Sequence, residues 1–208
     1  AVQFAAEHLK AKKIGYINHD DAYGTWNLTG ARAQADHLGD VQLIVQSINP
    51  NISDVTAPML KIRAANPDAL VLTTYARPAA LIIRKARELG FNKPIILTVT
   101  GTADLTQLVE NVGGPAALQN FYVQDVLRAL PSDPSLAWVY EMYQQYYPEL
   151  AAKPGHPQSY MPYGLSSAMA VVQALKDAGP DLTREKFLDA LENMTLETGI
   201  MAGPIQFT

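Results

Sequence analysis

Residues 13–24 read KIGYINHDDAYG, and the change from an apolar strand to a polar loop within this stretch decides the fold. Residues 13–17 predict a short β-strand, which the polar run NHDD at residues 18–21 brings to an end. Three more predicted strands run out into polar or aromatic loops, at residues 73–77, 98–102 and 123–128. The carboxyl ends of the strands in an open parallel α/β sheet lie on one edge, where ligands bind. We therefore expect these four loops to form a ligand-binding edge.

Strands and helices alternate outward from this stretch. The apolar runs predict five strands, at residues 13–17, 41–45, 69–72, 94–97 and 121–123. Helical spacing and capping signals predict helices before and between them, at residues 2–12, 26–38, 54–65, 78–89 and 102–109. Such a series with short connections predicts a right-handed, doubly wound parallel sheet of the flavodoxin-like α/β class, with a topological switch beside the first strand.

The alternation stops after residue 123, and the remaining sequence is mainly helical in pattern. Proline and glycine separate three predicted helices, at residues 134–147, 159–178 and 183–193, and residues 203–207 predict a last short strand. Trp138, Tyr140, Tyr143, Tyr146 and Tyr147 fall at helical spacings of three and four, which favours packing in a core or a contact on the hinge side over an aromatic ligand box.

Composition narrows the possible partners. The 208 residues carry 16 Lys and Arg against 20 Asp and Glu, a net charge of −4, and no basic run marks a phosphate-binding stripe, so we expect no nucleic-acid partner. No apolar stretch approaches the ~20 residues of a membrane span. The absence of cysteine excludes a disulfide framework, thiolate catalysis and a cysteine metal site.

Sequence motifs for catalysis are missing. No G-x-G-x-x-G follows the first strand, no phosphate-binding G-x-x-x-x-G-K-[ST] occurs, and GLSS at residues 164–167 lacks the second glycine of a hydrolase elbow. The run His19-Asp20-Asp21 fits a helix N-terminal cap better than a metal site, because adjacent residues on one loop rarely converge on one ion. We predict a protein without enzymatic activity, cofactor, catalytic residues or metal ligands.

The segment Asp20-Asp21-Ala22-Tyr23-Gly24 resembles the D-x-x-Y-G run of periplasmic solute-binding proteins of the branched-chain amino acid type. The resemblance continues in order along the whole chain. Residues 53–62 lead toward I-R-A-A-N-P-D, residues 69–75 are similar to a strand ending in tyrosine, residues 86–90 are similar to A-R-x-x-G, and residues 203–207 are similar to G-P-x-x-F. Each motif alone is weak, but five in this order are specific.

The resemblance implies one lobe of a type I periplasmic binding, or Venus-flytrap, fold. Residues 1–12 would be a helix near the hinge, and residues 13–208 the second lobe, with a helical part at 133–193 and a return strand near 203–207. The first lobe and the export signal would lie outside this sequence, so we expect weak ligand affinity from this chain alone. The family also implies a periplasmic location and a role as the substrate-binding component of an ABC importer, whose membrane permease would be the partner.

The same resemblance suggests the ligand residues. Tyr23 and Tyr75 fall where the family places aromatic side chains against the ligand, and Thr100 falls where its amino-acid-binding members place a glutamate for the ammonium group. Thr98 and Thr102 are its neutral neighbours. Because a buried ammonium without a carboxylate partner is costly, we expect a small carboxylate without a free α-amino group, an aromatic or other organic acid.

Arginines and one further tyrosine complete the candidate site. Arg77 and Arg128 follow strand ends and could pair with a ligand carboxylate, and Tyr163 is a secondary candidate near the hinge. Two alternatives to the transport role stay open: a ligand-sensing lobe of a regulator or receptor of the same fold, and a flavodoxin-like enzyme with an unrecognised site at the same strand ends.

Overall fold

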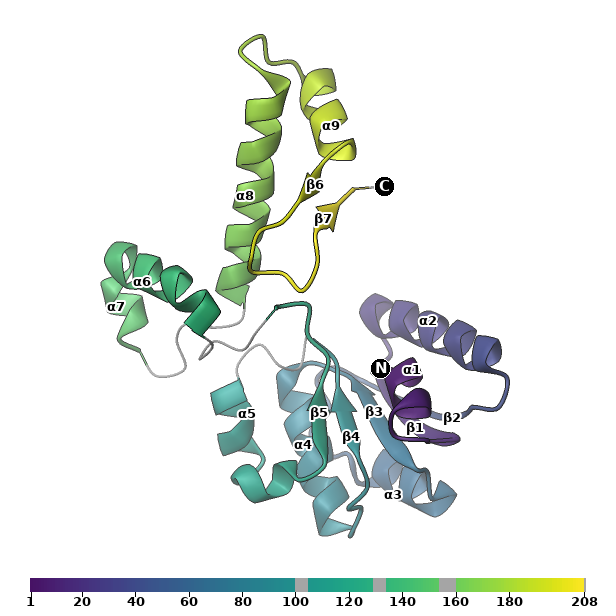
Figure 1. Ribbon diagram of the computed structural model, residues 1–208. Helices are drawn as coiled ribbons and strands as arrows, with labels where there is room; N and C mark the ends of the chain where they lie inside the picture. The colour runs from purple at the N-terminus through teal and green to yellow at the C-terminus, as the bar shows by residue number, and fades with distance from the viewer. Residues whose placement is uncertain (100–104, 129–133, 154–159, 208) are drawn as a thin grey trace. The chain divides into compact units, whose positions relative to one another are not determined.

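The computed structural model describes residues 1–99, 105–128, 134–153 and 160–207, and its chain divides into two compact units (Figure 1). Unit 1 comprises Ala1–Asp125 and unit 2 comprises Val126–Thr208. Among the described residues, no helix combines the length and the hydrophobicity that crossing a membrane requires.

A five-stranded parallel sheet forms the centre of unit 1. Its strands lie in the order β2-β1-β3-β4-β5, which confirms the predicted flavodoxin-like order with the switch beside the first strand. Tyr16 in the middle of β1 is in register with Val45 of β2 on one side and Val71 of β3 on the other. The strands are β1 Lys13–His19, β2 Gln42–Ile48, β3 Ala69–Thr73, β4 Ile95–Leu97 and β5 Phe121–Val123.

Helices cover both faces of this sheet, as Figure 1 shows. They are α1 Val2–Glu7, α2 Ala22–Leu38, α3 Thr56–Ala65, α4 Ala76–Glu88, α5 Leu105–Asn111 and the 3₁₀ turn η2 Pro115–Leu118. Side chains of successive strand residues point to opposite faces. Ala69 and Val71 of β3 therefore pack with α1 and α2, while Leu70 and Leu72 pack with α3, α4 and α5. β3 is fully buried, as its continuous apolar run predicts.

Two of the five sequence motifs, I-R-A-A-N-P-D and A-R-x-x-G, each contribute a side chain that holds backbone segments of unit 1 together. The Asp68 carboxylate accepts hydrogen bonds from the backbone N–H groups of Lys12 and Lys13, at 3.0 and 2.9 Å. The guanidinium of Arg87 donates to the backbone carbonyl oxygens of Phe91 at 2.6 Å and Ala117 at 2.9 Å. These residues thus join loops to the sheet and have a structural role.

Several element boundaries differ from the prediction for local reasons. α1 ends at Glu7 and not at residue 12, because Lys10 adopts a positive φ of 57°. α2 begins at Ala22, four residues earlier than predicted, because Asp21 caps it. α4 begins at Ala76, which places Pro78 in its first turn, where a proline is tolerated. The predicted helix at 102–109 is described only from residue 105, as α5.

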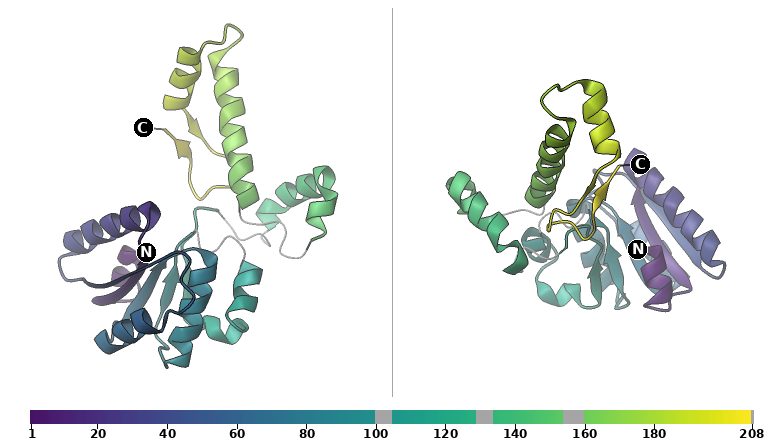
Figure 2. Two further views of the ribbon diagram at one scale, coloured as in Figure 1. Left: turned by 180° about the vertical axis from the view of Figure 1, so that it is seen from behind. Right: turned by 45° about the horizontal axis from the view of Figure 1, so that its top comes forward.

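Unit 2 contains helices and one small antiparallel ribbon. Residues 134–147 do not form the single predicted helix: a 3₁₀ turn, η3 Pro134–Leu136, precedes α6 Ala137–Tyr146, and α7 Pro148–Ala151 follows. α8 Tyr160–Ala178 and α9 Arg184–Glu192 lie side by side in the views of Figures 1 and 2. The predicted last strand is β7 Ile205–Gln206, which pairs with an unpredicted strand, β6 Thr195–Leu196.

Candidate functional site

Three of the predicted ligand residues meet at the carboxyl edge of the sheet in unit 1. Tyr23 lies in the first turn of α2 after β1, Tyr75 follows β3, and Thr98 follows β4. The rings of Tyr23 and Tyr75 stack with centroids 5.5 Å apart and an interplanar angle of 25°. The Tyr23 hydroxyl lies within hydrogen-bond distance, 3.3 Å, of Thr98 Oγ1. Loops after three different strands therefore build one aromatic surface with hydroxyl groups on it.

Asp21 fixes this surface and was not among the predicted ligand residues. Its Oδ1 accepts the backbone N–H of Gly24 at 2.8 Å and so caps α2, while its Oδ2 accepts the Tyr75 hydroxyl at 3.1 Å. The Gly24 N–H and, to a smaller extent, the Tyr75 hydroxyl lower the pKa of the Asp21 carboxyl below its usual 3.8. The carboxylate is thus ionised at neutral pH, and each of its oxygens already accepts a hydrogen bond from within the chain.

Gly24 allows the β1 loop to fold back onto α2. A Cβ atom at this position would lie only 1.9 Å from the carbonyl oxygen of His19. No side chain fits at that distance, so the glycine of the D-x-x-Y-G motif is required by close backbone contact. The Asn27 side-chain amide, one turn later, donates to the Tyr23 carbonyl at 2.8 Å and ties the tyrosine to its helix.

His19 packs against the buried side of the aromatic surface formed by Tyr23 and Tyr75. It is completely buried, and its ring meets the Tyr75 ring edge-on, with centroids 4.4 Å apart at 62°. Neither ring nitrogen has a hydrogen-bond partner within the described parts of the chain, and Nδ1 lies 3.9 Å from Asp21 Oδ2. Burial lowers the pKa of His19 below 6.5, outweighing the opposite effects of Asp21 and Asp20. His19 therefore serves as a neutral packing group at pH 7.

The N-terminus of α4 lies at the same edge of the sheet as Tyr23 and Tyr75. Tyr75 is its N-cap residue, with extended backbone, and the Tyr75 side chain makes no capping hydrogen bond. Pro78 has no N–H, so residues 76 and 77 carry the outward N–H donors of this end. Arg77 adds an exposed guanidinium to the first turn. A helix N-terminus of this kind favours an anion such as a carboxylate.

The remaining predicted site residues lie either outside the described residues or in unit 2. Thr100 and Thr102 lie outside the described residues. Arg128 and Tyr163 belong to unit 2: the Arg128 N–H donates to the Ile200 carbonyl at 2.8 Å, and Tyr163 packs, half-buried, against the cluster around Leu136 and Ile200. Their role toward a ligand stays a prediction.

The aromatic stripe of α6 is only partly a core element. Tyr143 is buried and Tyr140 packs against the unit 2 cluster, as predicted. Tyr146 and Tyr147, however, are 67% and 58% exposed, so core packing does not hold for these two, and a hinge-side contact stays a prediction for them. Tyr146 is the last residue of α6 and Tyr147 is its C-cap, so both lie at the end of the helix.

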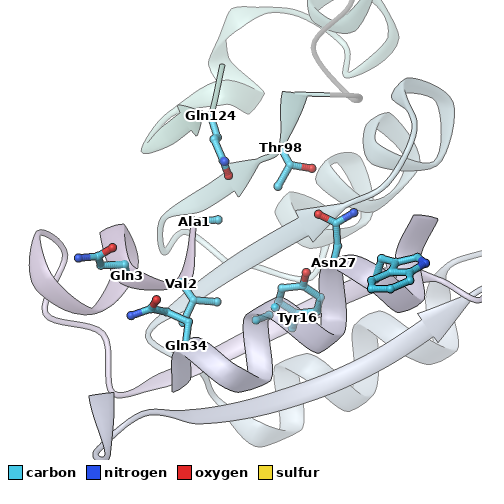
Figure 3. A pocket seen from close by; sticks show the side chains of 11 residues that line it. Ala1, Val2, Gln3, Tyr16, Asn27, Gln34, Thr98 and Gln124 are labelled. Atoms are coloured by element: carbon cyan, nitrogen blue, oxygen red, sulfur yellow. The ribbon is translucent and has the colours of Figure 1, made fainter. Parts of the chain in front are cut away.

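A cavity beside the aromatic surface was missed by sequence reasoning. It has a volume of about 420 Å³ and lies between α1, α2 and the ends of β4 and β5 (Figure 3). Thr98 lines it and also contacts the Tyr23 hydroxyl, so the two features adjoin. One signal was present in the sequence: Trp26 and Asn27 follow Tyr23 by three and four residues and share its side of the helix. The lining includes Tyr16, Trp26, Asn27, Gln34, Thr98 and Gln124.

These features define a class of protein: an α/β lobe that presents an aromatic, hydroxyl-bearing surface and a helix N-terminus at the carboxyl edge of its sheet. The chain matches the family model described as periplasmic binding protein over residues 1–208, and it belongs to that family. The resemblance seen in the five sequence motifs is thereby confirmed.

Curated relatives and solved structures agree with this membership. The chain is 27% identical over 175 residues to an amino acid binding protein of Pseudomonas aeruginosa, covering 82% of this chain and 43% of the relative. It is 22% identical over 191 residues to Leu/Ile/Val-binding protein homolog 8 of Brucella abortus, covering 91% and 46%. The chain thus spans less than half the length of these relatives.

Two solved structures share the fold. A leucine-binding protein of Thermotoga maritima matches with a TM-score of 0.77 at 24% identity, covering 99% of this chain and 55% of that one. A fatty acid ABC transporter substrate-binding protein of Thermomonospora curvata matches with a TM-score of 0.80 at 23% identity, covering 97% and 52%. These matches confirm the predicted lobe of a type I periplasmic binding fold.

Proposed function

We propose that this chain supplies one side of the ligand site in an extracytoplasmic substrate-binding protein of an ABC importer, and that its ligand is a small carboxylate. The observation that carries the proposal is the stacked pair Tyr23–Tyr75, held by Asp21 and Thr98 beside the N-terminus of α4. The task of such a surface is recognition, and no step of bond making or breaking is required of it.

The proposed contacts divide between the two ends of the ligand. The N–H donors of residues 76 and 77, with the guanidinium of Arg77 nearby, suit the carboxylate. The stacked rings of Tyr23 and Tyr75 offer a flat apolar surface to the rest of the molecule. Since Asp21 is already bonded to Gly24 and Tyr75, it is not the expected partner of a ligand cation.

The names of the relatives guide the choice among carboxylates. Those proteins are named for amino acids, for leucine, isoleucine and valine, and for fatty acids, all of which carry a carboxylate. An aromatic acid finds no support among them. We therefore place aliphatic carboxylates, with branched-chain amino acids first, ahead of the aromatic acids suggested by Thr100, which lies outside the described residues.

Transport would follow from closure on the ligand. A second lobe closing over the Tyr23–Tyr75 surface would bury the ligand from both sides, and the closed form would be the one that the membrane permease recognises. Tyr75 is 40% exposed in this chain, so part of its side chain lies at the surface over which the second lobe would close.

A thermal-shift screen of the full-length gene product tests the proposal. Leucine, isoleucine, valine, hexanoate and benzoate would each be added, because a ligand at 100 times its dissociation constant stabilises the folded state by about 2.7 kcal/mol. We expect stabilisation by at least one aliphatic carboxylate and none by leucinamide, which lacks the carboxylate. Equal stabilisation by leucine and leucinamide, or by no member of the panel, would contradict the proposal.

A further inference from the structure

The cavity beside Thr98 has a lining suited to hydrogen bonding without charge. We call it the amide cavity and define it by Tyr16, Trp26, Asn27, Gln34, Thr98 and Gln124. None of the eleven described residues that line it has a charged side chain. A volume of about 420 Å³ falls in the range of ~300–1,000 Å³ typical of small-molecule sites.

Polar groups from several elements converge on this space. Figure 3 shows the side chains of Tyr16, Asn27 and Gln124 directed into it from β1, α2 and the end of β5. Tyr16 is 3% exposed, and its hydroxyl accepts a hydrogen bond from Thr73 Oγ1 at 2.7 Å, which leaves its own hydrogen to donate. The Asn27 amide donates to the Tyr23 carbonyl, so its Oδ1 is the acceptor that faces outward.

The rim of the cavity adds adaptable amides and one aromatic face. Gln34 and Gln124 each offer a carbonyl oxygen and an NH₂ group. The Trp26 side chain is 77% exposed, although Ala31 and Ala35 of the same helix are buried in the core cluster. Such a lining accepts a group that both donates and accepts hydrogen bonds, while an ionised group would find no counter-charge among the side chains that line the cavity.

We propose that the amide cavity is a second compartment of the ligand site, which takes an uncharged hydroxyl or carboxamide at the far end of a small carboxylate. The inference rests on the proposed function, since the carboxylate end lies at the Tyr23–Tyr75 surface. Thr98 is the shared wall, because its hydroxyl contacts Tyr23 while the residue lines the cavity.

Pairs of ligands that differ only in the terminal hydroxyl test this inference. The affinities of hexanoate and 6-hydroxyhexanoate, and of norleucine and 6-hydroxynorleucine, would be measured by calorimetry on the full-length gene product and on its Gln124→Leu and Gln34→Leu variants. Both glutamines lie at the rim and not in the core, so folding is retained. Gln42→Leu, on the edge strand β2 and outside the cavity, is the matched control.

We expect at least one of the two cavity variants to weaken binding of the hydroxylated member of a pair by about twofold to tenfold, the value of one neutral hydrogen bond, and to leave the hydrocarbon member unchanged. Gln42→Leu should change neither. If both cavity variants affected the two members of each pair equally, or not at all, the inference would be overturned while the proposed function stood. If none of the four carboxylates bound the parent protein while leucine, isoleucine or valine did, the inference would be overturned and the proposed function would stand. If none of these carboxylates bound, the proposed function would fail and the inference with it.

Discussion

The Tyr75 hydroxyl donates a hydrogen bond to Oδ2 of Asp21 at 3.1 Å. The two residues are 54 positions apart in the sequence, and the bond joins the loop after β3 to the N-terminus of α2. Because Asp21 also caps α2 through Gly24, the orientation of the Tyr75 ring is coupled to the start of that helix. The aromatic surface is therefore fixed before any ligand arrives, which lowers the entropic cost of binding.

Substitutions of Asp21 can separate its two roles, which are to cap α2 and to orient the Tyr75 ring. Asparagine caps helices about as well as aspartate, but with Oδ1 bonded to Gly24 its Nδ2, a donor, takes the place of the Oδ2 that accepts the Tyr75 hydroxyl. We expect Asp21→Asn to keep nearly the parental free energy of unfolding while weakening ligand binding, and Asp21→Ala to lower both. Urea denaturation and ligand titration of the two variants measure this. Equal ligand affinity in Asp21→Asn and the parent would contradict the coupling.

Gly24 is a second sensitive position. Gly24→Ala places a Cβ atom 1.9 Å from the His19 carbonyl oxygen, and we expect a loss of about 3 kcal/mol or more in the free energy of unfolding. Gly30→Ala is the matched control in the same helix, because a Cβ atom there meets nothing within 4 Å. That change should stabilise by about 0.5–1 kcal/mol. Similar effects of the two substitutions would refute the close-contact explanation.

Arg87 gives a third prediction. Its guanidinium reaches the carbonyl oxygens of Phe91 and Ala117, which a lysine ammonium cannot contact together. Arg87→Lys should lower the free energy of unfolding by about 2 kcal/mol. Arg84→Lys, at an exposed position of the same helix, should change it by less than about 0.5 kcal/mol. Chemical denaturation of both variants measures these free energies. An Arg87→Lys variant as stable as the parent would contradict the role of the guanidinium in joining the two carbonyl oxygens.

The pH dependence of stability reports on His19. Since burial lowers its pKa in the folded state, the unfolded state binds the proton more readily as the pH falls below 6.5. The contribution of His19 to the free energy of unfolding is therefore fully present above pH 6.5. It decreases as the pH falls below that value, until the pKa of His19 in the folded state is reached. Urea unfolding from about pH 7.5 to about pH 5 should show a steeper decrease for the parent than for His19→Gln. Identical slopes for the parent and His19→Gln would contradict the burial of a neutral imidazole.

Much of the fold could be predicted because its signals are local. The buried run of β3 and the alternation of strands and helices were sufficient for the sheet order, and β5 was predicted with its observed bounds. Helix starts were less accurate, because α2 and α4 begin directly after their N-cap residues Asp21 and Tyr75, whose loop geometry apolar periodicity does not report. The strand β6 has two residues and depends on pairing with β7, so its own sequence carries little signal.

The candidate site was predictable only as a set of strand ends. Tyr23, Tyr75 and Thr98 follow from the rule that parallel strands bring their carboxyl ends together. The link between Asp21 and Tyr75 and the burial of His19 depend on how two loops pack, and no pattern within either loop encodes that contact. The amide cavity likewise depends on the spacing between α2 and the end of β5.

The affinity of one aliphatic carboxylate for a Tyr75 variant tests the central claim most directly. Isothermal titration of the full-length gene product, with the aliphatic acid or amino acid that stabilises it most, would be repeated on Tyr75→Ala and on Tyr146→Ala, an exposed tyrosine of unit 2. The Tyr23–Tyr75 surface predicts that Tyr75→Ala weakens binding at least about tenfold and that Tyr146→Ala changes it by less than about twofold. Parental affinity in Tyr75→Ala would contradict the account.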